Sequence, residues 1–257
     1  MLVNIDVKQI EWVAAVFWSQ DPVGMEEIKQ EYDIHADNQK RLKLPTRLIA
    51  KTLLFRTIYG GTGYSFATDP EFSNFGGEKW WDEKITSFLT KYQGLRAWHE
   101  RLYQRVVLDD GRLDLPTGRS YIFHPSKNRA GELHYPRTKI LNYPVQGLAA
   151  DLMAIARVSL YKRLKALNFK GLEDSRQEAE NGILWCNTVH DSIVLDIKNE
   201  LWYNISNEIV EVTQEVFRNI PLNFKRLFDL EFNLPVRAEI TYGPDWSNVT
   251  EFYEQRD

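Results

Sequence analysis

The sequence LPTRLIAKTLLFRTIYGG, residues 44–61, contains the pattern that decides the fold class of this chain. Pro45-Thr46 is typical of a helix start and Gly60-Gly61 of a helix end, so one helix is predicted between them. At about 100° per residue, side chains four positions apart share one face of that helix, and apolar side chains occupy the opposite face. The shared face carries Arg47, Lys51, Phe55 and Tyr59.

The chemistry of this face suits a polyphosphate attached to a ring system. Two cations one turn apart near a helix N-terminus can hold phosphates, because the helix dipole and the free N–H groups there also favour anions. The two aromatic side chains can stack on a sugar or a base. The alternative is a solvated face with extended cationic side chains. Phe55 and Tyr59 argue against it, because a solvated face rarely carries two large aromatic side chains.

The pattern R-x-x-x-K-x-x-x-F-x-x-x-Y-G resembles the fingers-helix signature of family A DNA polymerases, the DNA polymerase I family. The resemblance implies that Arg47 and Lys51 hold the incoming triphosphate, with Lys51 also taking part in catalysis. It further implies that Phe55 packs beside the sugar and that Tyr59 lies beside the templating base.

The segment VNIDVKQIEWVAA, residues 3–15, predicts a strand that ends in a carboxylate and is followed by a helix. This is a common position for a metal ligand, but a lone Asp there is more often only a helix cap. The segment resembles the D-x-x-Q-I-E motif of the family. By that resemblance Asp6 and the Val7 carbonyl bind magnesium, and Gln9 and Glu11 belong to the nucleotide site. Glu11 would be the steric gate against a ribose 2′-hydroxyl.

The segment TVHDSIVLD, residues 188–196, has apolar runs on both sides of a polar pair and predicts a β-hairpin with a carboxylate at its tip. Taken alone, an Asp-Ser pair in a turn is usually only a turn. The segment resembles the V-H-D-E motif of the family, which makes Asp191 the second metal carboxylate and puts His190 near the primer terminus on DNA. Two aspartates suffice for two Mg²⁺ ions, or for Mn²⁺ in their place, because magnesium prefers few carboxylates plus substrate phosphates.

Two positions depart from the family pattern. Ser192 stands where most members have Glu, so a secondary metal contact is weakened. Val13 stands where an Arg is common, so any contact made by that Arg is absent or replaced.

Weaker matches follow in family order. DIH at residues 33–35 resembles the segment whose His contacts phosphate, here His35. NYPVQG at residues 142–147 resembles the segment whose Asn and Gln touch template and primer DNA, here Asn142 and Gln146. With the final YGPDW, the resemblance covers essentially the whole chain, and the subset is phage-like.

The bulk composition is that of an ordinary folded protein of one large or two modest domains, with 257 residues and 43% hydrophobic side chains. A net charge of −4 argues mildly against nucleic-acid binding, and only the motifs overrule it. No apolar run reaches the roughly 20 residues that span a bilayer, and no signal peptide is recognised. The single Cys186 suits a reducing cytoplasm, which would be that of the host for a phage protein.

The predicted fold is α+β, a polymerase palm of antiparallel sheet and helices with an inserted, largely helical fingers subdomain and no thumb. The expected boundaries are palm at 1–24, fingers at 25–135 and palm again at 136–257. Elements are predicted as follows: a strand at the start and a helix after it, helices at 83–107, 146–167 and 202–217, hairpins at 109–125 and 183–197, and a closing strand at 236–246.

The implied function is template-directed DNA synthesis, in which dNTPs are added to the 3′ end of a primer on template DNA. Only five residues precede Asp6, so we expect a second subunit with the thumb and a 3′–5′ exonuclease, and an exposed sheet edge near Met1. A single-subunit RNA polymerase is the first alternative, but Glu11 and Phe55 favour deoxynucleotides. A non-catalytic DNA-binding remnant of a polymerase and a two-carboxylate nuclease are the others.

Overall fold

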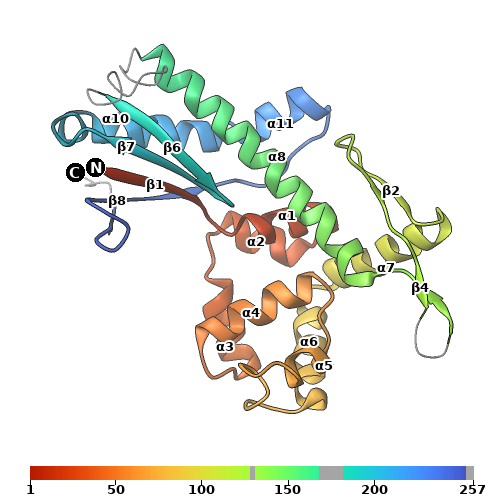
Figure 1. The fold of residues 1–257 in the computed structure, drawn as a ribbon. Helices are drawn as coiled ribbons and strands as arrows, with labels where there is room; N and C mark the ends of the chain where they lie inside the picture. The colour runs from red at the N-terminus through yellow and green to blue at the C-terminus, as the bar shows by residue number, and fades with distance from the viewer. Residues whose placement is uncertain (128–130, 168–181, 253–257) are drawn as a thin grey trace. The chain divides into compact units, whose positions relative to one another are not determined.

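The computed structural model of the chain describes residues 1–127, 131–167 and 182–252. It shows two compact units, one of residues 1–10 with 149–257 and one of residues 11–148 (Figure 1). The first unit combines helices with an antiparallel sheet, and the second is mainly helical. No helix in the described ranges is long and apolar enough to cross a membrane.

Each unit has its own set of strands and helices, and two helices contain residues of both units. The elements of the first unit are β1 (Leu2–Val7), β6 (Ile183–Val189), β7 (Ser192–Ile197), α10 (Asn199–Arg218), α11 (Ile220–Phe228), β8 (Ala238–Gly243) and β9 (Thr250–Glu251). Those of the second are α2 (Pro22–Lys29), α3 (Ile34–Leu42), α4 (Arg47–Ile58), α5 (Gly63–Ala67), α6 (Glu78–Lys91), α7 (Gln93–Leu108), β2 (Arg112–Asp114), β3 (Ser120–Ile122), β4 (Ser126–Lys127) and β5 (Leu133–His134). The boundary is crossed by α1 (Ile10–Ser19) and α8 (Arg137–Ala166).

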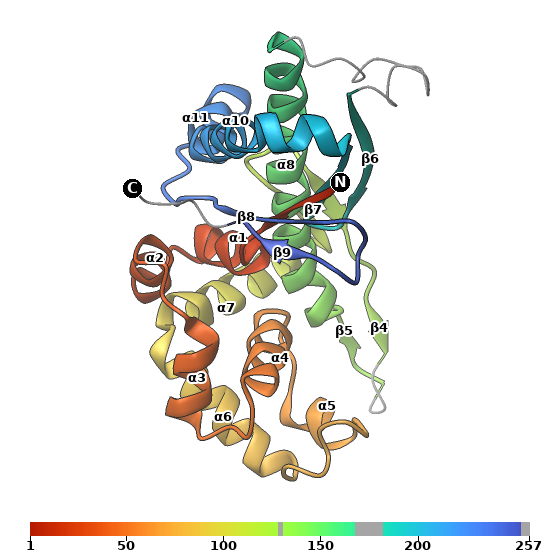
Figure 2. The same ribbon diagram turned by 90° about the vertical axis from the view of Figure 1, so that its left-hand side faces the viewer.

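The sheet of the first unit has the strand order β6-β7-β1-β8-β9, and every neighbouring pair is antiparallel. Burial alternates along β1, so Val3, Ile5 and Val7 are buried while Asp6 on the other face is half-buried. Helix α10 lies along one face of this sheet (Figures 1 and 2). The alternation predicted for the first strand is therefore confirmed.

The expectation of an exposed sheet edge at the first strand is wrong. β1 is the central strand, because β7 and β8 from the far end of the chain pair with it on both sides. The amino group of Met1 donates to the Ile197 carbonyl oxygen at 2.6 Å. Among the described residues the edges of this sheet are β6 and β9.

The predicted helix of the opening pattern is confirmed as α4. The side chain of Thr46 caps it by accepting a hydrogen bond from the Ile49 backbone N–H at 3.2 Å. Its apolar face is buried, with Leu53 and Leu54 fully inaccessible. The chain then turns at Gly60, whose φ of +75° lies in the left-handed region that glycine adopts without strain.

The single helix predicted at 83–107 is wrong, because the structure has α6 and α7 in its place. Asp21 explains the break. Its fully buried carboxylate accepts hydrogen bonds from the backbone N–H groups of Gly94 at 2.7 Å and Leu95 at 3.2 Å. The same carboxylate accepts from Gly24 at the start of α2. One distant side chain thus caps two helices, and no local pattern reveals it.

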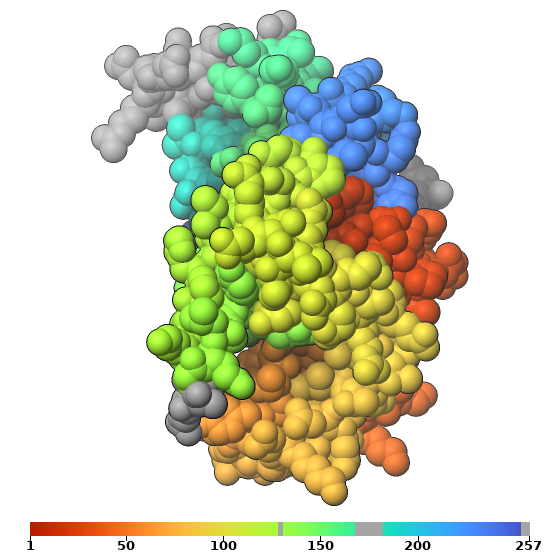
Figure 3. Space-filling view, turned by 90° about the vertical axis from the view of Figure 1, so that its right-hand side faces the viewer, coloured from red at the N-terminus to blue at the C-terminus, as the bar shows by residue number. Residues whose placement is uncertain are grey.

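The helix predicted from residue 146 begins nine residues earlier, as α8, and continues through Pro144. Proline usually ends a helix, since it lacks an N–H and its ring clashes with the preceding turn. Here the flanking side chains Ile140, Leu141 and Val145 are fully buried, and their packing outweighs that loss. The predicted hairpin is confirmed by β2 and β3, which lie beside α7 on one face of the second unit (Figure 3). The short hairpin β4–β5 was not predicted.

Candidate active site

Two aspartates 185 positions apart occupy adjacent positions at one end of the first unit's sheet. Asp6 pairs with Ser192 in the register of β1 against β7, and the Val7 N–H donates to the Asp191 carbonyl oxygen at 2.9 Å. Both aspartates are half-buried. The tertiary structure therefore places the backbones of the two aspartates that the motifs singled out next to each other.

The hairpin tip sets the position of the second aspartate. Val189 pairs with Ser192, so His190 and Asp191 alone form the turn between β6 and β7. His190 has φ +51°, in the left-handed region, which lets the two strands meet with so short a connection. This turn lies next to the end of β1, where Gln9 also has a positive φ, of 53°.

The donor set at this end of the sheet fits a magnesium ion that keeps some of its water. Asp6 and Asp191 offer carboxylate oxygens, which are the ligands that magnesium prefers, and the Val7 carbonyl lies on the same strand end. Among the described residues no three His, Cys, Asp or Glu side chains are grouped to hold a metal. A magnesium ion held by few carboxylates keeps ligand positions for water or substrate oxygens.

Ser192 does not replace the acidic side chain that is common at its position. It is 7% exposed, and its hydroxyl donates to the Val189 carbonyl oxygen at 3.0 Å. The side chain therefore stabilises its own hairpin.

Three side chains form a hydrogen-bonded cluster within the second unit. Tyr59 donates its hydroxyl to Glu11 Oε1 at 2.5 Å. Gln146 donates its Nε2 to the same oxygen at 2.5 Å and to the Tyr59 hydroxyl at 2.6 Å. Burial raises the pKa of Tyr59, and the hydrogen bond to the Glu11 carboxylate raises it further, so the phenol stays a donor. The cluster joins α1, the end of α4 and α8, and it holds the Glu11 side chain from two directions.

At the other end of α4, Arg47 and Lys51 are exposed. The Arg47 guanidinium makes a bidentate pair with Asp33, from Nε to Oδ2 and from Nη2 to Oδ1, each at 3.1 Å. Lys51 Nζ lies 5.8 Å from the centroid of the Phe55 ring. The predicted order along the helix, two cations followed by two aromatic rings, is present.

His35 lies beside this cationic end but is not itself a cation. It is 4% exposed, and its ring centroid is 6.1 Å from that of Phe55. Burial, and after it the positive charges of Arg47 and Lys51, lower the pKa of His35 to about 4. Its Nδ1 is buried without a hydrogen-bond partner among the described residues. His35 is therefore neutral at pH 7 when no anion is bound beside it.

Asn142 lies one turn before Gln146 on α8 and is half-buried. The two predicted DNA-contacting side chains thus come from the same region of one helix. Trp18 of α1 donates its Nε1 to the Pro144 carbonyl oxygen between them at 2.9 Å. This contact ties the helix to α1 at the point where Gln146 meets Glu11.

The sequence profile of the family described as DNA polymerase family A matches residues 1–248 of this chain. The chain belongs to DNA polymerase family A. Its sequence is 24% identical over 268 residues to the thermostable DNA polymerase I of Thermus aquaticus, covering 98% of this chain and 27% of that protein. It is 23% identical over 255 residues to DNA polymerase I of Caldicellulosiruptor bescii, covering 96% of this chain and 26% of that protein. The chain thus spans about a quarter of the length of these relatives.

The solved structures agree on the fold. The POL domain of Pol1 from M. smegmatis, in a complex with DNA primer-template and dNTP, has a TM-score of 0.73 at 19% identity. The match covers 95% of this chain and 40% of that one. The fold is therefore that of a family A polymerase domain, of mixed helix and antiparallel sheet.

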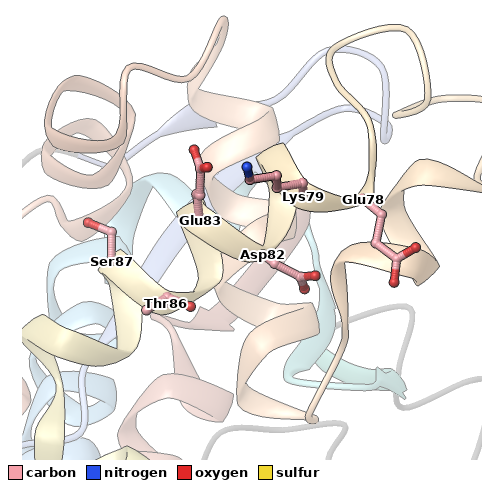
Figure 4. A pocket seen from close by; sticks show the side chains of 6 residues that line it. All are labelled: Glu78, Lys79, Asp82, Glu83, Thr86 and Ser87. Atoms are coloured by element: carbon pink, nitrogen blue, oxygen red, sulfur yellow. The ribbon is translucent and has the colours of Figure 1, made fainter.

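A hollow elsewhere on this family A chain has the wrong charge for a nucleotide. It lies along α6, has a volume of about 700 Å³, and offers three carboxylates against one lysine (Figure 4). Its lining residues are Glu78, Lys79, Asp82, Glu83, Thr86 and Ser87. The negative charge of such a surface repels a triphosphate.

Two contacts of the site were not predicted from the sequence. The role of Asp33 as partner of Arg47 was not predicted, although an Asp just before a helix is a recognisable N-cap. The bond of Gln146 to Glu11 and Tyr59 was not predicted either, because nothing local signals a contact between residues 135 positions apart.

Proposed function

We propose that this chain carries the catalytic centre of a template-directed DNA polymerase and adds dNTPs to the 3′ end of a primer. The adjacency of Asp6 and Asp191 at the end of the sheet carries the proposal, because it presents two carboxylates where a two-metal centre needs them. The first unit would be the palm, and the second would hold the fingers. Primer-template DNA and dNTP, which the M. smegmatis POL domain binds, are the proposed substrates.

The proposed roles follow from chemistry and position. Asp6, Asp191 and the Val7 carbonyl would hold two magnesium ions, which supply charge stabilisation for phosphoryl transfer when bound. Arg47 and Lys51 bind the triphosphate by charge at the start of α4.

The remaining side chains shape the substrate sites. Phe55 and Glu11 bound the sugar pocket, and Tyr59 lies near the templating base. The other proposed contacts are Gln9 and His35 to the nucleotide and Asn142, Gln146 and His190 to DNA.

Primer extension by the full protein, with a labelled primer-template, dNTPs and magnesium, tests this function. Asp6→Ala and Asp191→Ala should each lower extension by orders of magnitude while DNA binding persists, because the charge stabilisation acts mainly in the transition state. Asp196→Ala is the matched control, since Asp196 lies on the same strand β7 and is exposed. Ser192→Ala should have a mild effect.

Three outcomes would contradict the proposal or redirect it. Near-normal extension by either aspartate variant removes the two-metal centre from these residues. Extension with NTPs in preference to dNTPs indicates an RNA polymerase, and DNA binding without any extension indicates a non-catalytic remnant. The second subunit with thumb and exonuclease stays a prediction, which the mass and composition of the natural protein's assemblies test. The phage origin and the cytoplasmic location stay predictions as well.

A further inference from the structure

Asp33 connects two parts of the proposed triphosphate site in the second unit. It is the N-cap of α3, where its Oδ1 accepts from the backbone N–H groups of His35 at 3.1 Å and Ala36 at 3.0 Å. The same carboxylate holds the Arg47 guanidinium through both oxygens. One side chain thus fixes both the start of the helix that carries His35 and the first cation of α4.

The geometry of the pair leaves Arg47 able to bind phosphate at the same time. A guanidinium has five N–H donors, and Asp33 engages Nε and Nη2. The Nη1 donors stay outside the pair. Arg47 therefore does not have to leave Asp33 in order to bind a triphosphate oxygen.

Stability alone does not account for the pair. The side chains of Arg47 and Asp33 are 56% and 49% exposed, and ion pairs at such positions contribute little to folding. A long cationic side chain at the first position of a helix would otherwise sample many rotamers. A bidentate carboxylate removes most of that freedom before any ligand arrives.

We propose that Asp33 is a positioning residue for nucleotide binding, which holds Arg47 in the orientation that receives the triphosphate and aligns the His35 turn beside it. This inference rests on the proposed function. Asp33 itself does not touch the nucleotide, and its negative charge is neutralised by Arg47 and by two backbone N–H groups. The opposite role, in which Asp33 competes with the triphosphate for Arg47, predicts the reverse effect on affinity.

The Asp33→Asn variant separates these roles, because Asn is as good an N-cap as Asp but does not form the ion pair. If Asp33 positions Arg47, the KM for dNTP should rise about 2- to 12-fold in Asp33→Asn, with little change in kcat. This rise corresponds to the free energy needed to order one such side chain on binding. Arg47→Ala should raise KM by about 10- to 100-fold. In the Arg47→Ala background, Asp33→Asn should change KM less than about 2-fold, since the side chain it positions is gone.

Asp37→Asn is the matched control on the same helix. It removes the same charge from α3, but Asp37 pairs with Lys91 at 2.7 Å, outside the proposed site. We expect lower thermal stability and an unchanged KM. dNTP binding by calorimetry, with the full protein and primer-template, supplies a readout besides activity.

Each result decides the matter. A KM that is unchanged or lower in Asp33→Asn, or one that rises equally with and without Arg47, overturns the positioning role while leaving the polymerase proposal intact. Failure of the unsubstituted protein to bind dNTP overturns both. A rise in KM that disappears in the Arg47→Ala background supports the inference.

Discussion

Removing the Glu11 side chain should open the sugar pocket to ribonucleotides. Glu11 is held by the Tyr59 hydroxyl and by Gln146 Nε2, both at 2.5 Å and both on Oε1. Two donors on one oxygen hold the Glu11 side chain in a fixed orientation. A ribose therefore meets a fixed obstacle there. Glu11→Ala removes the obstacle, whereas Glu11→Gln keeps its volume and a carbonyl acceptor.

The expected discrimination between dNTP and NTP follows from the rigidity of the cluster of Glu11, Tyr59 and Gln146. Forcing an extra atom into a filled, fixed site costs about 1–3 kcal/mol, which corresponds to a discrimination of about 5- to 150-fold. Glu11→Ala should lose discrimination of that order, and Glu11→Gln should stay within about 3-fold of the unsubstituted protein. Glu11→Ala should lower the free energy of unfolding by only about 1–2 kcal/mol, because Gln146 and Tyr59 keep their hydrogen bond to each other, at 2.6 Å.

The assay is single-nucleotide extension of one primer-template by the full protein, with a dNTP and the matching NTP measured separately. The ratio of the two kcat/KM values is the discrimination. Unchanged discrimination in Glu11→Ala refutes the gate. Equal loss in Glu11→Ala and Glu11→Gln would show that charge, and not volume, rejects the ribose.

Three further predictions concern other positions. Phe55→Tyr should raise incorporation of dideoxynucleotides in the same extension assay, as the family resemblance implies, and unchanged incorporation would mean that Phe55 does not border the sugar. Asp21→Ala should lower the free energy of unfolding by about 2–5 kcal/mol, because it removes a cap and leaves the N–H groups of Gly94 and Leu95 unsatisfied, which chemical denaturation measures. Burial, and after it the charge of Arg137, lower the pKa of His99 from 6.5 to about 4, so stability should be complete above about pH 6.5 and fall toward pH 4. The free energy of unfolding should be about 2 kcal/mol lower at pH 5, and His99→Gln should reduce this dependence on pH in denaturation curves. An unchanged pH dependence in His99→Gln would exclude His99 as its source.

The helical and strand elements whose signals are local were predictable from the sequence. The cap of Thr46, the apolar face with Leu53 and the turn at Gly60 all lie within a few residues of α4, so propensity and periodicity suffice. The same holds for the alternation along β1 and for the two-residue turn at Asp191.

Elements whose limits depend on distant partners were not predictable. The break between α6 and α7 requires the Asp21 carboxylate from more than 70 positions away. The continuation of α8 through Pro144 requires a buried environment for the preceding turn. Local rules describe the chain in isolation, and here tertiary contacts outweigh them.

For the site, the sequence by itself determined which residue types stand at which spacing, and hence the family and its candidate residues. Only the folded chain shows that the turn with Asp191 lies beside the end of β1 that carries Asp6, that Gln146 contacts Glu11, and that Asp33 holds Arg47. The two kinds of interaction differ in the distance along the chain over which they act. Periodicity and capping act over one or two turns, whereas sheet register and side-chain hydrogen bonds join residues that only the folded chain brings within reach.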